Sequence, residues 1–372
     1  MKSSKSLALA TLLIAGSLAA HHGYAANAAG GKSKKKTAAQ TEQSSEQGGA
    51  EYVHFAQWKE VSEFIDRMAQ THGFDRDKLA ADFDNTRYVE SAIKLVKPAP
   101  SGKPKNWKAY RARFVEPRRI DAGIAFWDQY ADALARAESQ YGVPAEIIVG
   151  LIGVESIFGR MTGSFRVMDT LTTLAFAYPD TPTREARMEF FRGELENLLL
   201  LSRESNVDPF SFKGSYAGAI GLPQFMPGSI RKFAVDFDGD GKIDLSGSAI
   251  DAIGSVANYL ALHGWQRSLP TVFPATLTVG DAEIANGVVS NFQTQGLKAA
   301  YSLEDLKAIA STAGDAPGNL QYGLVDLQNG YEATEYWFAT DNFYAITQYN
   351  RSFFYAMSVI DLGRVIGAAR GQ

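Results

Sequence analysis

One glutamate of this sequence stands in a strongly apolar segment. Residues 144–160 read PAEIIVGLIGVESIFGR and predict a helix that the proline opens. On that helix Glu155 has Leu151 and Ile152 one turn before it and Phe158 one turn after it. Apolar surroundings penalise a charged carboxylate and raise its pKa, so Glu155 could donate a proton near neutral pH. A buried glutamate bonded to a neighbouring backbone group fits the segment equally well.

Glycines mark two places where another group could approach. Gly150 and Gly153 lower the stability of the glutamate helix, which indicates close contact with another backbone or with a ligand. Residues 214–228 read GSYAGAIGLPQFMPG and are dense in small residues. Their mixture of polar and apolar side chains suits an amphipathic sugar; these side chains are Ser215, Gln224, Phe225 and Met226. An ordinary turn-rich connection is the other interpretation.

A third segment has oxygen-bearing residues at the spacing of an EF-hand calcium loop. Residues 236–244 read DFDGDGKID, with carboxylates at loop positions 1, 3, 5 and 9 and glycine at position 6. Position 12 holds Gly247 in place of the usual glutamate. A solvated turn rich in aspartate and glycine is the alternative. The predicted ligands within the segment are Asp236, Asp238, Asp240 and the backbone carbonyl of Lys242.

Composition restricts the remaining chemistry. The chain has 372 residues, 45% of them hydrophobic and 21% charged, which suffices for a large core in two or three domains. It has no cysteine, which excludes disulfides and thiolate chemistry, and beyond the leader only His54, His72 and His263 remain as histidines. A net charge of −4 gives no reason to expect a nucleic-acid partner. Catalysis is therefore expected to depend on carboxylates.

The amino-terminal residues have the pattern of an export signal. Residues 1–26 combine Lys2 and Lys5 with a short apolar run and small residues, so we expect a signal peptide. An uncleaved membrane anchor is the alternative, although the run is shorter than the ~20 residues that a span needs. Residues 27–50 predict a disordered linker, whose basic run could contact anionic polymers. Without a cysteine for lipid attachment, the exported protein is expected to be soluble.

Helical periodicity dominates the rest of the chain. Helices are predicted from Trp58 to a stop at Gly73, as one amphipathic stretch over 120–141, and over 144–160, 190–201, 249–262 and 354–365. Strand-like stretches lie at 271–279 and 323–338. We expect a mainly α protein of the α+β class. Its predicted parts are a helical region over 51–265 with the glutamate and the aspartate loop, a small β-containing insertion over 266–335, and a C-terminal part of the core over 336–372.

Together these segments resemble the lytic transglycosylases of the membrane-bound lytic murein transglycosylase B type, including its soluble form. The resemblance covers roughly residues 51–372 and is highly specific, because five motifs occur in the family's order. The motifs are Gly153–Arg160, Ser215–Pro227, Ala234–Gly241, Asp251–Tyr259 and the C-terminal segment 342–352.

The resemblance implies a lysozyme-like helical core with an α domain and a small β domain. It implies a periplasmic carbon–oxygen lyase that cleaves the β-1,4 bond between N-acetylmuramic acid and N-acetylglucosamine in peptidoglycan. A glutamate protonates the leaving oxygen and then, as a base, helps the muramoyl C6 hydroxyl to attack C1, which leaves a 1,6-anhydro end. The partners are peptidoglycan glycan strands, with other cell-wall enzymes as further candidates.

Matched residue by residue, the family's cleft implies that Glu155 is the acid and base. The residues that would line the site with it are Tyr110, Arg187, Ser215, Gln224, Met226, Tyr259, Tyr349, Asn350 and Tyr355. Arg187 matches an arginine on the peptide side, and each tyrosine could instead be an ordinary core residue. The chemistry needs no cofactor. The family closes its aspartate loop around a structural Ca²⁺ with an aspartate at the next helix start, here Asp251, although this loop is about one residue longer.

The family interpretation agrees with the lack of a clear second carboxylate. Most glycoside hydrolases need two carboxylates beside the bond. Asp169, Glu194 and Glu196 are candidates, yet none lies in a segment like that of Glu155. One carboxylate suffices if the substrate supplies the nucleophile. The rival functions are a hydrolytic muramidase, a catalytically inactive peptidoglycan-binding protein and a calcium-responsive interaction protein.

Overall fold

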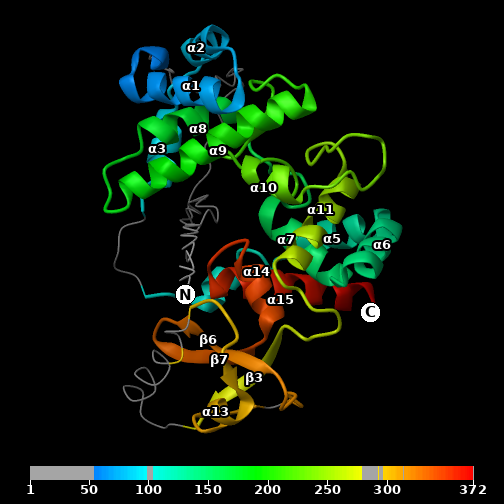
Figure 1. Cartoon of the computed structure of the whole chain (residues 1–372). Helices are drawn as coiled ribbons and strands as arrows, with labels where there is room; N and C mark the ends of the chain where they lie inside the picture. The colour runs from blue at the N-terminus through cyan, green and yellow to red at the C-terminus, as the bar shows by residue number, and fades with distance from the viewer. Residues whose placement is uncertain (1–53, 99–103, 279–291, 293–295, 313, 372) are drawn as a thin grey trace, which may run out of the picture.

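The molecule is elongated, with helices at one end and in the middle and a sheet at the other end (Figure 1). The computed structural model describes residues 54–98, 104–278, 292, 296–312 and 314–371. We call the parts the helical lobe, the helical core and the β lobe. The predicted signal peptide and linker, 1–26 and 27–50, lie outside the described residues.

The helical lobe combines early and middle segments of the chain (Figure 1). It contains the 3-10 turn η1 (Phe55–Gln57) and helices α1 (Lys59–His72), α2 (Arg76–Asp84), α3 (Glu90–Val96), α8 (Val167–Phe176) and α9 (Arg184–Ser205). The rings of Phe64, Phe83 and Phe176 meet edge to face in its core, with centroids 5.9–6.4 Å apart. Helix α1 ends where the sequence predicted, at Gly73 with a φ of 67°.

The helical core surrounds α7 (Ala145–Ser156). Its other helices are α5 (Pro117–Gln129), α6 (Ala131–Tyr141), α10 (Pro227–Phe233), α11 (Ala249–Leu262), α14 (Asp341–Thr347) and α15 (Phe353–Arg370). Every residue of α7 except Glu146 and Glu155 is buried. A helix that is apolar on all sides needs neighbours on all sides, and α5, α6, α11 and α15 supply them.

Helices α7 and α15 pack at the distance of backbone contact. A Cβ at Gly150 would lie 2.2 Å from the carbonyl oxygen of Val359, and one at Gly363 would lie 2.1 Å from the carbonyl oxygen of Glu146. No side chain fits at either position without moving the two helices apart. The predicted close approach of another backbone is therefore confirmed at Gly150, where that backbone is α15. At Gly153 the nearby atoms are instead the side chains of Phe158 and Leu362.

The stretch 120–141, predicted as one helix, is two helices. Helix α5 ends at Gln129 and α6 begins at Ala131, and Tyr130 between them has φ −116° and ψ 26°. The apolar periodicity continues through the break, so nothing in the sequence marks it. The reason is tertiary, because α5 packs on α15 whereas α6 packs on α11. The next helix begins at Ala145 with Pro144 as its N-cap residue, one position before the predicted first turn.

The β lobe is an antiparallel sheet with the strand order β4-β6-β7-β3-β5. The strands are β3 (Val272–Leu277), β4 (Tyr301–Ser302), β5 (Ala310–Thr312), β6 (Gln321–Asn329) and β7 (Glu332–Ala339), accompanied by α13 (Leu303–Lys307). Leu324 faces Phe338 across β6 and β7, and both pack with Leu306 of α13. Alternate residues such as Val325 join the main core on the opposite face.

A short helix joins the β lobe to the core. Helix α4 (Trp107–Arg111) packs against both α15 and β6. The backbone N–H of Lys108 donates to Oδ1 of Asn329 at 2.9 Å, and Trp107 is buried against Phe354 of α15. This contact fixes the direction in which α4 presents Tyr110.

The predicted fold class, mainly α with a modest β portion, is confirmed. Besides the main sheet, the described residues contain a small antiparallel ribbon of β1 (Phe165–Arg166) and β2 (Lys213–Gly214) beside the glycine-rich segment. In the part of the chain that the structure describes, no helix has both the length and the apolar character required to cross a bilayer.

Candidate active site

Glu155 is the second-last residue of α7, and its side chain is partly buried. The hydroxyl of Tyr355, on α15, donates a hydrogen bond to Oε1 of Glu155 at 2.5 Å. Burial raises the pKa of Glu155 to about 7, and the hydrogen bond from Tyr355 lowers it by a smaller amount. The carboxyl is therefore available as a proton donor near neutral pH, and its hydrogen bond from Tyr355 comes from a side chain and not from the backbone.

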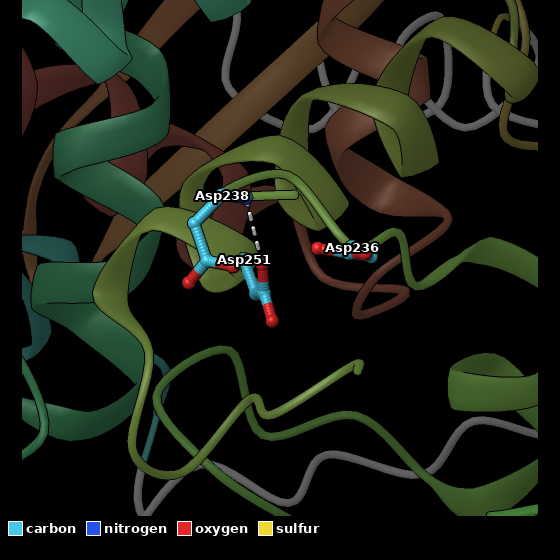
Figure 2. A group of neighbouring side chains, drawn as sticks. All are labelled: Asp236, Asp238 and Asp251. Atoms are coloured by element: carbon cyan, nitrogen blue, oxygen red, sulfur yellow. Dashed lines mark hydrogen bonds between the residues drawn. The ribbon is translucent and has the colours of Figure 1, made fainter. Parts of the chain in front are cut away.

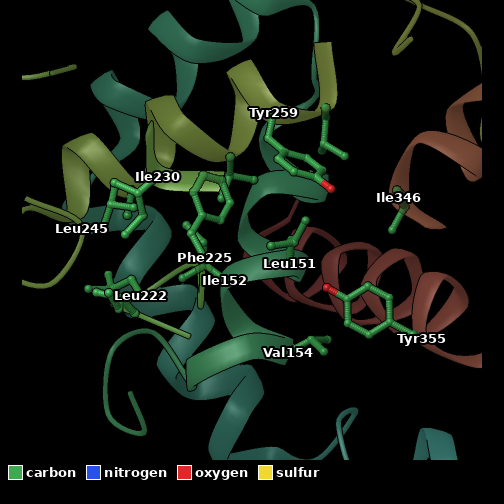
Figure 3. Packing of buried hydrophobic residues seen from close by; sticks show 14 of the residues in the cluster. Leu151, Ile152, Val154, Leu222, Phe225, Ile230, Leu245, Tyr259, Ile346 and Tyr355 are labelled. Carbon is green, nitrogen blue, oxygen red and sulfur yellow. The ribbon is translucent and has the colours of Figure 1, made fainter. Parts of the chain in front are cut away.

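Three tyrosines continue from Glu155 as a wall of rings. Tyr349 stacks on Tyr355 with centroids 6.4 Å apart and an interplanar angle of 14°, and Tyr259 meets Tyr349 edge to face at 4.8 Å. Tyr259 donates its hydroxyl to the carbonyl of Gln348 at 2.9 Å. Figure 3 shows Tyr259 on α11 and Tyr355 on α15, with Leu151 of α7 drawn between them. The hydrogen bonds of Tyr259 and Tyr355 therefore hold the two ends of this wall of rings in position.

Tyr110 approaches Glu155 from α4. Its ring packs on Trp107 and Phe354 with centroids 6.5 and 5.5 Å away. Burial raises the pKa of Tyr110 to about 12, and the negative charge of Glu155 contributes to the shift. The same charge, after burial, also raises the pKa of Tyr349 and Tyr355. The structure thus brings together three of the predicted tyrosines around the glutamate, all of them as phenols at neutral pH.

The glycine-rich segment forms a tight turn beside these rings. The hydroxyl of Ser215 accepts the backbone N–H of Ala219 at 3.0 Å, so it serves its own turn. Gln224 has a φ of 52°, and its Nε2 donates to the carbonyls of Gly221 at 2.9 Å and Thr162 at 3.1 Å. These bonds hold the amide of Gln224 in a fixed orientation.

The remaining predicted residues have different environments. Phe225 is only 2% exposed and packs under Tyr259 and Tyr349, so it supports the wall from behind. Met226 is partly buried as the N-cap residue of α10. Asn350 is buried, and within the described residues its Oδ1 has no hydrogen-bond partner. A buried oxygen of this kind needs a partner, which an ordered water or a ligand can supply.

Arg187 lies on α9 in the helical lobe, where its charge lowers the pKa of Tyr178 against the larger effect of burial. The three carboxylates considered as catalytic partners are also engaged with groups of their own. Asp169 accepts from Arg166 at 2.6 Å, Glu196 contacts His72 at 2.9 Å, and Glu194 accepts the N–H of Gly228 at 2.7 Å.

The aspartate loop forms a compact acidic cluster (Figure 2). One carboxylate oxygen from each of Asp236, Asp238 and Asp251 lies within 4.8 Å of the others. Oxygens that share a calcium ion lie at most about 5 Å apart, because each Ca–O distance is about 2.3–2.6 Å. The spacing and the hard oxygen donors therefore fit calcium. Asp240 is not in this cluster, and its Oδ1 accepts the N–H of Lys242 at 2.8 Å.

Asp251 organises the cluster from the first turn of α11. It is buried, its Oδ1 accepts the N–H of Phe237 at 2.7 Å, and its Oδ2 accepts the N–H of Asp244 at 2.9 Å. These bonds hold both ends of the loop against the helix start. Asp238 is exposed and accepts the hydroxyl of Ser248 at 2.6 Å, which lowers the pKa of Asp238.

Sequence reasoning missed Ser156, which follows the glutamate. Its side chain is fully buried, and its hydroxyl donates to the carbonyl of Leu222 at 2.7 Å. A backbone carbonyl as acceptor leaves no signal in a sequence, so only the presence of a serine at the end of an apolar helix could have indicated a specific bond.

Comparison with known proteins shows the family to which the chain belongs. Residues 55–364 match the family model described as the transglycosylase SLT domain. The chain belongs to this family of lytic transglycosylases, as its motifs predicted. It is 43% identical over 332 residues to the membrane-bound lytic murein transglycosylase B of Escherichia coli (strain K12), an alignment that covers 86% of this chain and 85% of that protein.

Solved structures are similar over the same range. Soluble lytic transglycosylase SltB1 from Pseudomonas aeruginosa aligns with a TM-score of 0.75 and 45% identity, covering 84% of this chain and 100% of that one. The Escherichia coli lytic transglycosylase Slt35 in complex with calcium aligns with a TM-score of 0.73 and 40% identity, covering 86% of this chain and 96% of that one.

Proposed function

We propose that Glu155 is the catalytic acid and base of this lytic transglycosylase. The bond cleaved is the β-1,4 bond between N-acetylmuramic acid and N-acetylglucosamine in peptidoglycan. The observation that carries the proposal is the location of Glu155 on a buried apolar helix, with the phenol of Tyr355 bonded to its carboxyl. Burial raises the pKa of Glu155 to about 7, and a carboxyl that is neutral near pH 7 can protonate a glycosidic oxygen. Tyr355 donates to Oε1, which leaves Oε2 as the oxygen that carries the acid proton.

The reaction needs two proton transfers at the same carboxyl. Oε2–H of Glu155 gives its proton to the glycosidic oxygen as the bond from that oxygen to C1 breaks. The carboxylate then takes the proton of the muramoyl C6 hydroxyl while the C6 oxygen bonds to C1. Glu155 returns to its neutral form, no water is consumed, and the product carries a 1,6-anhydro end. Between the two transfers the phenol of Tyr355 stabilises the carboxylate.

A single carboxylate supports a transglycosylase over a hydrolytic muramidase. A hydrolase of the usual kind needs a second carboxylate beside the bond, either to activate water or to attack C1. Among the described residues, Asp169, Glu194 and Glu196 have partners of their own. The groups around Glu155 are phenols, which stay neutral at the working pH. The nucleophile is therefore assigned to the substrate.

The rings and the glycine-rich turn are proposed to hold the sugars. Flat phenol rings give apolar faces, and the amides of Gln224 and Asn350 give polar contacts to hydroxyl and N-acetyl groups. Phe225 acts through the rings above it. The proposed substrate residues are Tyr110, Ser215, Gln224, Met226, Tyr259, Tyr349, Asn350 and Tyr355, with Arg187 on the side of the peptide stem.

We also propose that the acidic cluster binds a structural calcium ion. The spacing of its carboxylate oxygens and the calcium complex of Slt35 support this. Asp236, Asp238 and Asp251 would supply carboxylates, with Asp240 and the carbonyl of Lys242 completing the set. The ion would tie the loop to α11 and take no part in the chemistry. The protein is proposed to act in the periplasm, on glycan strands and beside other cell-wall enzymes.

Product analysis tests the proposed function. Purified protein is incubated with sacculi, and the released muropeptides are identified by mass spectrometry with and without borohydride reduction. We expect fragments lighter by one water than hydrolysis products and resistant to reduction. Reducing muramic acid ends would instead establish a muramidase. Sacculus binding without release of fragments would establish a binding protein.

A further inference from the structure

The residue after Glu155 joins the glutamate helix to the glycine-rich segment. The hydroxyl of Ser156 donates to the carbonyl of Leu222 at 2.7 Å and accepts the N–H of Gly159 at 3.0 Å. The backbone between Ser156 and Gly159 has an uncommon conformation, because Ile157 and Phe158 have left-handed φ angles of 51° and 56°, respectively. Such a shape persists only when the surrounding contacts fix it.

Two kinds of contact fix this turn. The ring of Phe158 packs on Phe126 with centroids 5.0 Å apart, and a Cβ at Gly153 would lie 2.7 Å from that ring. The Ser156 hydroxyl supplies the polar contact, as both a donor and an acceptor. The carbonyl of Leu222 would lose this partner if the hydroxyl were removed, and an unpaired buried carbonyl is unfavourable.

The bond from Ser156 closes a ring of contacts around the proposed acid. Next to Leu222, the carbonyl of Pro223 accepts the hydroxyl of Tyr349. Tyr349 stacks on Tyr355, and Tyr355 donates to Glu155. Two adjacent carbonyls of the glycine-rich segment are thus held, one by Ser156 and the other by the tyrosine pair. The position of the glycine-rich segment therefore affects the position of Tyr349 and, through the stacked rings, the direction from which Tyr355 donates to the carboxyl of Glu155.

We propose that the hydroxyl of Ser156 is a positioning group, which aligns the glycine-rich segment and, through Tyr349, the phenol of Tyr355 with Glu155. The proposal rests on the proposed function of Glu155. Ser156 would not touch the substrate. Its loss would let the Leu222–Gln224 turn shift, which would misalign both the amide of Gln224 and the bond from Tyr355 to the acid.

The test is the pH dependence of turnover in the whole protein. For Ser156→Ala we expect kcat to fall about tenfold to a hundredfold, as for other small misplacements of reacting groups. The alkaline limb of kcat/KM should move to higher pH, because a weaker bond from Tyr355 no longer lowers the pKa of Glu155. In the part of the chain that the structure describes, the phenols of Tyr110, Tyr349 and Tyr355 face Glu155, and burial raises the pKa of each above its ordinary value, so they do not titrate in this range.

A matched control separates positioning from general stability. Ser202 lies near the end of α9, is buried, and donates to the carbonyl of Val207 at 2.5 Å. Ser202→Ala should lower the melting temperature without moving the alkaline limb. Ser156→Cys leaves no cavity, because its thiol is slightly larger than the hydroxyl, but the thiol donates only weakly. It should shift the limb in the same direction as Ser156→Ala, and it is the test variant if the alanine protein does not fold.

Two results would overturn the proposal. One is a Ser156→Ala protein with the wild-type kcat and limb. The other is a limb that moves equally in Ser202→Ala. Failure of the proposed function would look different, because the wild-type protein itself would then release no anhydro product.

Discussion

The phenol of Tyr355 donates to Oε1 of Glu155 from 200 positions away in the sequence. The two residues meet because α15 packs against α7 at backbone contact, which Gly150 and Gly363 permit. The bond opposes the larger effect of burial, which raises the pKa of Glu155 to about 7. The same contact therefore sets both the direction of the carboxyl and the pH at which it can act.

Removing this phenol should raise the pKa of Glu155. In Tyr355→Phe the ring and its stacking remain, but the bond that lowers the pKa is lost. We expect the alkaline limb of kcat/KM to move up by about one pH unit, since a bond to a charged group contributes about 1.5 kcal/mol. The carboxylate formed during turnover also loses its donor, so kcat should fall about tenfold.

The control for this variant is Tyr322→Phe. Tyr322 is a buried tyrosine of the β lobe whose hydroxyl donates to the carbonyl of Pro317 at 2.7 Å. It should leave the pH profile unchanged. An unaltered alkaline limb in Tyr355→Phe would mean that the hydrogen bond has no influence on the acid.

Glu155→Gln should inactivate the enzyme and stabilise the fold at high pH. The amide cannot donate and retake a proton, so turnover should fall by about 10²–10⁴-fold or more, while sacculus binding survives. The raised pKa of Glu155 means that its folded form favours the neutral acid. Its contribution to stability is complete below the ordinary pKa of 4.5 and is lost as the pH rises through about 7.

The free energy of unfolding of Glu155→Gln should therefore equal that of the wild-type protein at about pH 4. It should exceed the wild-type value at about pH 8, by at most about 3 kcal/mol. Denaturant unfolding at both pH values measures this difference, and turnover is assayed on the same preparations. Near-normal turnover by a folded Glu155→Gln protein would remove Glu155 from the mechanism. Loss of folding together with activity would make it a structural residue.

The apolar surroundings of Glu155 could be predicted from local sequence, because these neighbours are on the same helix, but the segment alone fitted a structural glutamate equally well. Its surroundings could not, since Tyr110, Tyr349 and Tyr355 come from distant segments and were implied only through the family resemblance. The structure brings these tyrosines to the glutamate. It gives Ser215 a role in its own turn and buries Phe225 behind the rings, and neither location follows from residue type.

The fold shows the same division between local and distant causes. The end of α1 at Gly73 follows from one residue's freedom at positive φ. The break at Tyr130 does not, because it depends on the different neighbours of α5 and α6. Ser156 escaped notice for a related reason, since its acceptor is a backbone carbonyl 66 positions away.

Calcium should raise the melting temperature by mass action, because the ion binds the folded loop only. Asp238→Ala should weaken that response, since Asp238 is one of the three clustered carboxylates. Activity should persist in abundant calcium. Differential scanning calorimetry with calcium and with chelator measures the effect. The control is Asp305→Ala, an exposed aspartate that caps α13 in the β lobe, which should keep the full response. Identical melting curves with calcium and chelator would reduce the loop to a plain turn.

Two glycines in helices should respond in opposite ways to substitution by alanine, because Gly150 lies at the contact between α7 and α15 whereas Gly193 lies in open space on α9. At Gly150 a methyl group would lie 2.2 Å from the carbonyl oxygen of Val359, so the helices must separate. Gly150→Ala should destabilise the protein by about 2 kcal/mol or more, as for overpacking in a core, and should reduce turnover because Tyr355 moves away from Glu155. In α9, a Cβ at Gly193 would have no atom within 4 Å apart from its chain neighbours and the backbone of its own helix. Gly193→Ala should therefore stabilise the protein by about 0.5–1 kcal/mol through helix propensity alone. Urea unfolding of both variants measures the pair, and destabilisation by Gly193→Ala or tolerance of Gly150→Ala would contradict the packing described for these helices.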